Sequence, residues 1–163
     1  MADLPARRAI LGALALGVAS SRAQSAPLTA TVIQPTPHNF ATLLARTEAA
    51  ITAHDMLILA RASASEGAAK RGIRIPGNAV FLVFRNDFAV RMLAASVAAG
   101  IEAPIPIYLT ENPDGTTAIA YRRPSAAFAP YAAAARDAPA LAAMARKLDT
   151  IFAAIATEAA GHS

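Results

Sequence analysis

An alternating stretch followed by a tight turn constrains the fold of this 163-residue chain more than any other feature. In residues 104–109 (PIPIYL), isoleucine and leucine recur with the period of two that is typical of a strand buried on one face. Asn112–Gly115 (NPDG) then favours a turn, and residues 117–121 (TAIAY) return with Thr, Ile and Tyr on one face. These features predict an antiparallel hairpin. Because Pro104 and Pro106 remove N–H groups from the same edge, we expect that edge to be unpaired or frayed.

The rest of the chain predicts alternating strands and helices. Expected strands are Thr29–Gln34, Met56–Ala60 and Val80–Phe84. One helix is expected to begin at Thr36-Pro37 and end near His54-Asp55, and a short one to run from Ser63 or Ser65 to Arg71. A third begins at a cap on Asn86 or Asp87 and stops at Gly100, and a long last one is entered at Asp137 and Pro139. The expected inner faces carry Phe40, Leu43, Leu44, Thr47 and Ile51 in the first helix, Val90, Leu93 and Val97 in the third, and Leu141, Met144, Leu148, Ile151 and Ile155 in the last.

The first 25 residues indicate an export signal. Arg7 and Arg8 precede an uncharged apolar run from Ala9 to Ala19, which is shorter than the roughly 20 residues of a membrane span. Small residues then allow cleavage after Ala23 or Ser25. An ordinary secretory signal and a twin-arginine signal both fit this pattern. We therefore expect a periplasmic or secreted protein with no stable membrane anchor after cleavage.

Composition excludes several classes of protein. The chain has no cysteine, so disulfides, thiolate metal sites and covalently attached c-type haem are ruled out. Its net charge is +4, but three of its 15 basic and one of its 11 acidic residues lie in residues 1–25, which leaves +2 after cleavage. With this small charge and no tryptophan, we expect no nucleic-acid partner.

Several landmarks in the right order resemble one bacterial family. They are Phe40 early in a helix, AAKRGIRIP at Ala68–Pro76, Phe84 with Asn86 after an apolar strand, and EAPIPIYLTENPDG at Glu102–Gly115. From Phe40 to about Tyr131 the chain is similar to the family called domain of unknown function 302.

The resemblance implies a fold similar to that of the TATA-box-binding protein, often as a dimer, and no established enzyme activity. We thus expect an α+β fold with a curved, mainly antiparallel sheet, helices packed on one face, and a long C-terminal helix. The expected boundaries are 1–25 for the signal, 26–135 for the α+β domain, and 136–163 for the helix and a short tail. This chain departs from the family at Ser63-Ala64, where relatives often carry aspartate and histidine, and at Arg85 and Asp87, which replace glycine and proline.

The polar corner Arg85-Asn86-Asp87 is the candidate ligand site. Free N–H groups at the start of the following helix favour an anion, and Arg91 lies one turn further on. With Glu102, these residues would form a crevice for a small anionic or apolar ligand. The alternative is structural, with Asp87 capping its helix and Arg85 pairing with Asp87 or Glu102.

The expected function is that of an exported, non-enzymatic small-ligand-binding or accessory protein, and a homodimer. No metal site and no cofactor are expected, since no two histidines have ligand spacing. One alternative is a periplasmic haem-binding or redox-linked protein, with His54 and Met92 as haem ligands. A weaker alternative is an enzyme that acts on a small carboxylate through Asp87 or Glu102.

Overall fold

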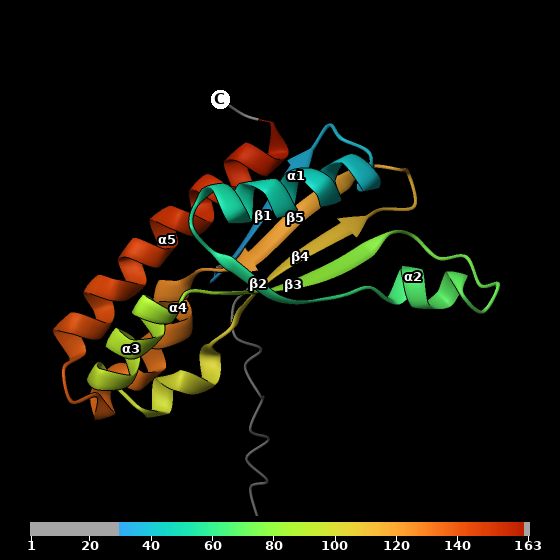
Figure 1. The fold of residues 1–163 in the computed structure, drawn as a ribbon. Helices are drawn as coiled ribbons and strands as arrows, with labels where there is room; N and C mark the ends of the chain where they lie inside the picture. The colour runs from blue at the N-terminus through green and yellow to red at the C-terminus, as the bar shows by residue number, and fades with distance from the viewer. Residues whose placement is uncertain (1–29, 162–163) are drawn as a thin grey trace, which may run out of the picture.

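The computed structural model describes residues 30–161, and the predictions for residues 1–25 lie outside this range. Five antiparallel strands form one sheet in the order β1-β5-β4-β3-β2 (Figure 1). The strands are β1 (Thr31–Thr36), β2 (Leu57–Ala62), β3 (Asn78–Phe84), β4 (Ile105–Glu111) and β5 (Thr117–Arg122). The helices are α1 (Phe40–Ala53), α2 (Ala64–Ala69), α3 (Asn86–Ala95), α4 (Pro124–Phe128) and α5 (Ala138–Ala160), with 3-10 helices η2 (Ala98–Glu102) and η3 (Ala129–Ala134).

The predicted hairpin is formed by β4 and β5. Ile107 pairs with Tyr121 and Glu111 pairs with Thr117, and Gly115 in the connecting turn has a φ of 82°. β4 is an interior strand, since it also pairs with β3 along its length. Its pairing with β5 begins only at Ile107, after Pro106, so the missing proline N–H falls where no β5 partner is present.

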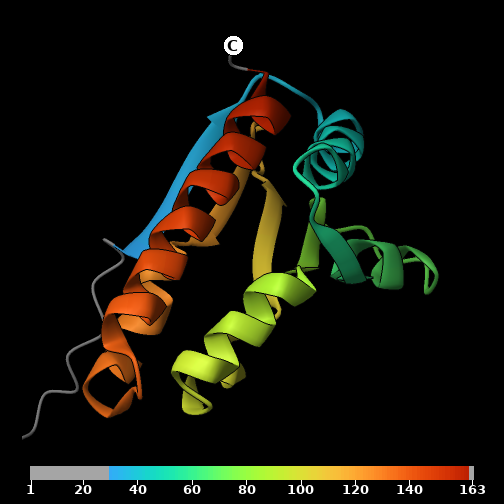
Figure 2. The same ribbon diagram turned by 60° about the vertical axis from the view of Figure 1, so that its left-hand side comes forward.

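One face of the sheet is covered by α1 and α5, which lie on the same side of it (Figures 1 and 2). Fully buried side chains come from the sheet and from both helices: Phe81, Ile107 and Ile119 from the sheet, Leu43 and Ile51 from α1, and Phe152 and Ile155 from α5. The centroid of the Phe152 ring lies 5.6 Å from the centroid of the Tyr121 ring on β5. The predicted α+β class, with an antiparallel sheet, helices on one face and a long C-terminal helix, is confirmed.

Helix α5 extends beyond the sheet. Its 23 residues span about 35 Å at 1.5 Å per residue, whereas strands of six or seven residues span roughly 20 Å. The N-terminal part of α5 therefore overhangs, and α3 and α4 pack against it there (Figure 2). Asp137 caps its first turn, as predicted, through a 2.9 Å bond from the Ala140 N–H. Within residues 30–161, no helix combines the length and the apolar character that crossing a membrane requires.

Helix α1 begins later than the sequence predicts. Its cap is Asn39, whose side chain accepts a hydrogen bond from the N–H of Thr42, and its first residue is Phe40. Thr36 is the last residue of β1, where its hydroxyl lies 2.6 Å from that of Thr117 on β5. This buried cross-strand hydrogen bond favours the strand over the cap that Thr36-Pro37 predict.

The prediction for the inner face of α3 is wrong. Val90 and Leu93 are exposed, and Val97, which lies beyond the helix, is 75% exposed. The buried side chains are Phe88, Met92 and Ala95. Both sets have spacings of three and four residues, so periodicity cannot choose between them. The packing of α3 on α5 determines which of the two sets is buried, because the set that faces α5 is covered by it.

We expect Phe152→Ala to destabilise the fold severely, because it removes the ring that joins α5 to the sheet. Replacing a fully buried Phe typically lowers the free energy of unfolding by about 3–5 kcal/mol. Urea denaturation measures this loss. Ile101→Ala, at a side chain that is 80% exposed, is the control and should cost less than about 0.5 kcal/mol. Equal effects of the two substitutions would contradict the role assigned to Phe152.

Candidate functional site

The polar corner lies where β3 leads into α3. Arg85 occupies the cap position with extended backbone, but no side chain caps the helix there. The prediction that Asn86 or Asp87 caps α3 is therefore wrong. Both residues already lie in the first turn of the helix. A capping side chain belongs to the residue before this turn, where it can accept a hydrogen bond from the N–H of N2 or N3.

The Asp87 carboxylate instead holds two arginines. Its Oδ1 accepts a hydrogen bond from Nε of Arg85 at 2.8 Å, and its Oδ2 accepts one from Nη2 of Arg91 at 2.5 Å. Nε of Arg91 also donates to the Asp87 backbone carbonyl at 3.0 Å. Both guanidinium carbons lie over the Phe88 ring, at 4.2 Å and 4.7 Å from its centroid. This cluster (Arg85, Asp87, Phe88, Arg91) carries a net charge of +1.

The cluster lowers the pKa of Asp87. Partial desolvation of the carboxyl would raise its pKa, but the hydrogen bonds and positive charges of Arg85 and Arg91 outweigh this effect. Asp87 is therefore an ionised anchor for the two arginines at neutral pH, and its hydrogen bonds fix the direction of each guanidinium.

Glu102 does not join this cluster. It lies in η2, where its carboxylate accepts a hydrogen bond from the Tyr131 hydroxyl at 2.8 Å and lies 3.6 Å from Nη1 of Arg122. The hydrogen bond to the carboxylate raises the pKa of Tyr131. Of the five predicted site residues, the structure joins Arg85, Asp87 and Arg91 in one cluster. Asn86 lies beside them as the first residue of α3, and Glu102 makes a separate contact.

The space behind Arg85 is too small for a ligand. A cavity of about 20 Å³ lies there among apolar side chains, including Phe88, Met92 and Phe128. This volume holds at most about one water molecule. This cavity therefore does not form a crevice of ligand size beside Arg85, and Asp87 and Glu102 do not line it.

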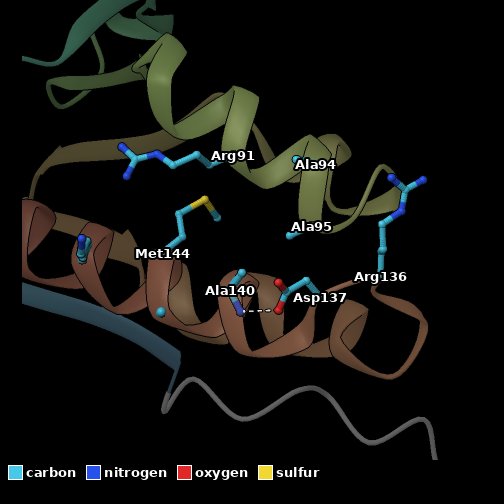
Figure 3. A pocket seen from close by; sticks show the side chains of 9 residues that line it. Arg91, Ala94, Ala95, Arg136, Asp137, Ala140 and Met144 are labelled. Atoms are coloured by element: carbon cyan, nitrogen blue, oxygen red, sulfur yellow. Dashed lines mark hydrogen bonds between the residues drawn. The ribbon is translucent and has the colours of Figure 1, made fainter.

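A larger groove runs between α3 and the overhanging part of α5 (Figure 3). Its volume is about 570 Å³. Small and apolar side chains form its floor: Ala94 and Ala95 from α3, and Ala140, Ala143 and Met144 from α5. The two helices are joined at one end, where the N–H groups of Arg136 and Asp137 donate to the Ala95 carbonyl at 2.8 Å and 3.2 Å.

Three cationic side chains line this groove. Arg91 extends the polar corner into it, Arg136 lies beside Ala95, and Lys147 lies on α5 one turn beyond Met144. Arg136 and Lys147 form no ion pair with any residue in the 30–161 range. Arg91 was predicted from the sequence as a site residue, but Arg136 and Lys147 were not. Neither has a local signal, because the groove forms only when α5 packs against α3.

The two residues of the haem hypothesis lie apart. Nε2 of His54, at the end of α1, is 3.1 Å from Oε2 of Glu158 near the end of α5. Met92 is buried and lines the small cavity with Met144. Met144 and Glu158 are about 20 Å apart along α5 at 1.5 Å per residue. Across residues 30–161, no three His, Asp or Glu side chains gather where they could hold a metal ion.

Replacing Asp87 with Asn should remove a pH-dependent part of the stability. Because the pKa of Asp87 is lowered on folding, its contribution is present above the unfolded value of about 3.9 and is lost as the pH falls through the folded pKa. For so exposed a pair we expect less than about 1 kcal/mol. Urea denaturation of the wild type and Asp87→Asn should differ at neutral pH, and the difference should shrink as the pH falls through the lowered pKa of Asp87 in the folded state. A difference that persists unchanged at low pH would contradict the ionic role.

Comparison with known proteins agrees with the resemblance found in the sequence. The crystal structure of an uncharacterized conserved protein DUF302 from Bacillus stearothermophilus is similar in fold, with a TM-score of 0.68. The two chains are 18% identical, and the similarity covers 80% of this chain and 98% of that one. No curated protein matches this chain. The family model described as "Domain of unknown function DUF302" matches residues 32–155, and the protein therefore belongs to the DUF302 family.

Proposed function

We propose that this protein binds small anionic ligands with an apolar part in the groove between α3 and α5, and that it does so without catalysing a reaction. The observation that carries the proposal is the combination of three cationic side chains with an apolar floor in one groove. Its volume of about 570 Å³ falls within the roughly 300–1,000 Å³ of sites that bind small molecules.

Charge favours a negative group at one end of the groove. Arg85 and Arg91 share the single carboxylate of Asp87, so their cluster retains one positive charge, and Lys147 adds another. At the other end of the groove, the positive charge of Arg136 is offset by the negative charge of the adjacent Asp137. A carboxylate or phosphate group would therefore bind between Arg91 and Lys147.

The geometry of Arg91 suits such a contact. Its Nε and Nη2 are occupied by Asp87, which holds the planar guanidinium in place. Five N–H donors belong to each arginine, so donors remain for a ligand. An arginine held in advance loses less conformational entropy when the ligand binds.

The floor suits an alkyl chain or a small ring. Alanines at Ala94, Ala140 and Ala143 keep the groove open, and Met144 offers a flexible, polarizable surface. No serine or histidine lines the groove, and its only carboxylate, Asp137, accepts the hydrogen bond that caps α5. The lining therefore supports binding and offers no nucleophile or free general base.

The place of action follows from the N-terminal sequence. The arginine pair and the apolar run predict export, so the ligand would be met in the periplasm or outside the cell. Together these features support an exported binding or accessory protein.

We expect octanoate, which combines a carboxylate with an alkyl chain, to bind the purified protein in a calorimetric titration. Lys147→Ala should weaken this binding by at least about tenfold, or roughly 1.4 kcal/mol, because it removes the unpaired charge. Ala143→Leu should also weaken binding, because the larger side chain fills the floor.

The matched controls for octanoate binding lie outside the groove. Lys70→Ala removes an exposed lysine at the end of α2. Ala153→Leu enlarges an exposed alanine on α5 that lies nearly three turns from Ala143. Both should bind octanoate like the wild type. Octylammonium, with the opposite charge, should bind more weakly than octanoate. The proposal fails if octanoate does not bind, or if the groove and control variants behave alike.

A further inference from the structure

The connection between β2 and β3 forms an arm that projects away from the body of the sheet (Figures 1 and 2). This segment, residues 63–77, is here called the arm and contains α2 and the turn that follows it. Asn78 fixes its base, because its side chain accepts a hydrogen bond from the Ala64 N–H at 2.9 Å and its N–H donates to the Ser65 hydroxyl at 3.2 Å. Residues 69–76, at the tip, are all exposed. The arm is therefore held at its base and presents its tip to solvent.

The net positive charge of the chain lies on the arm. Its basic residues are Lys70, Arg71 and Arg74. Its one acidic residue, Glu66, is bound by Arg61 at the base, with 2.7 Å between Oε1 and Nη1. The rest of residues 26–163 carries nine basic and nine acidic residues and is balanced. The three cations of the arm form no ion pair within residues 30–161, so their charge is available to a partner.

Two aliphatic side chains are exposed beside these cations. Ile73 is 49% exposed and Ile75 is 42% exposed, and Arg74 lies between them in the sequence. Cations interleaved with apolar side chains are typical of segments that bind at a membrane surface, where the cations attract anionic headgroups and the apolar groups enter the boundary with the acyl chains. We propose that the arm binds reversibly to the surface of a membrane that contains anionic phospholipids.

The composition and shape of the arm favour lipid over other anionic partners. Single-stranded nucleic acids stack their bases on aromatic side chains, and residues 63–77 contain none. An acidic protein could pair with the cations, but it would also need a hollow that accepts a protruding tip with both isoleucines. A fluid bilayer accepts such a tip without a preformed hollow. The arm shares no residue with the groove between α3 and α5, so this proposal does not depend on octanoate binding.

Sedimentation with lipid vesicles tests the role of the charges. The full chain should bind vesicles of equimolar phosphatidylcholine and phosphatidylglycerol at least about tenfold more tightly than vesicles of phosphatidylcholine alone, and added salt should weaken this binding. Replacing Arg71 and Arg74 together with alanine should weaken it at least about tenfold. The control replaces Arg123 and Arg146, two exposed arginines outside the arm, and should bind like the wild type although its net charge falls equally. Equal losses in the two double variants, or no binding by the wild type, would overturn the proposal.

The isoleucines distinguish a membrane from other polyanions. Ile73→Ser combined with Ile75→Ser should weaken binding to the anionic vesicles at least about fivefold, because it removes the groups that enter the bilayer. Ile101→Ser, at an isoleucine outside the arm that is 80% exposed, should leave binding unchanged. Unchanged binding of the double serine variant would indicate attraction to negative charge alone and would overturn the proposal.

A fluorescent probe measures insertion of the tip directly. Because the chain has no cysteine, an introduced one is a unique attachment site. An environment-sensitive dye on Ile75→Cys should shift its emission to the blue when anionic vesicles are added, whereas the same dye on Ile101→Cys should not. No shift at position 75, or equal shifts at both positions, would contradict insertion of the arm.

Discussion

The packing of α5 on the sheet is the interaction on which the rest of the structure depends. Phe152 and Ile155 are fully buried between the helix, the sheet and α1, and the Phe152 ring contacts Tyr121 on β5. A five-stranded sheet covered by α1 alone would leave β1 and β5 poorly covered, because α1 makes its main strand contacts with β2, β3 and β4, whereas α5 packs on β1 and β5. The last 23-residue element of the chain therefore completes the core. The family match runs to residue 155 and includes most of this helix, beyond the limit near Tyr131 that the sequence suggested.

The length of α5 also explains the groove. A helix that ended with the sheet would meet only strands and α1, but α5 overhangs and gives α3 and α4 a surface to pack on. Where α3 and α5 meet, alanines on both sides keep the side chains from filling the space between them. The cationic residues Arg91 and Lys147 are thus brought to one groove by packing between helices that are far apart in the sequence.

The sequence predicted those features that local chemistry decides. The hairpin followed from alternation and a turn, and α5 followed from one unbroken apolar stripe with a cap at Asp137. Features that depend on tertiary contacts were missed. Thr36 extends β1 because it meets Thr117, and α3 buries Phe88 and not Val90 because α5 lies on that side. For the candidate site, the sequence predicted the charged corner and, as one alternative, the pairing of Arg85 with Asp87. It gave no sign of the groove beyond this corner, because that groove forms only between α3 and α5.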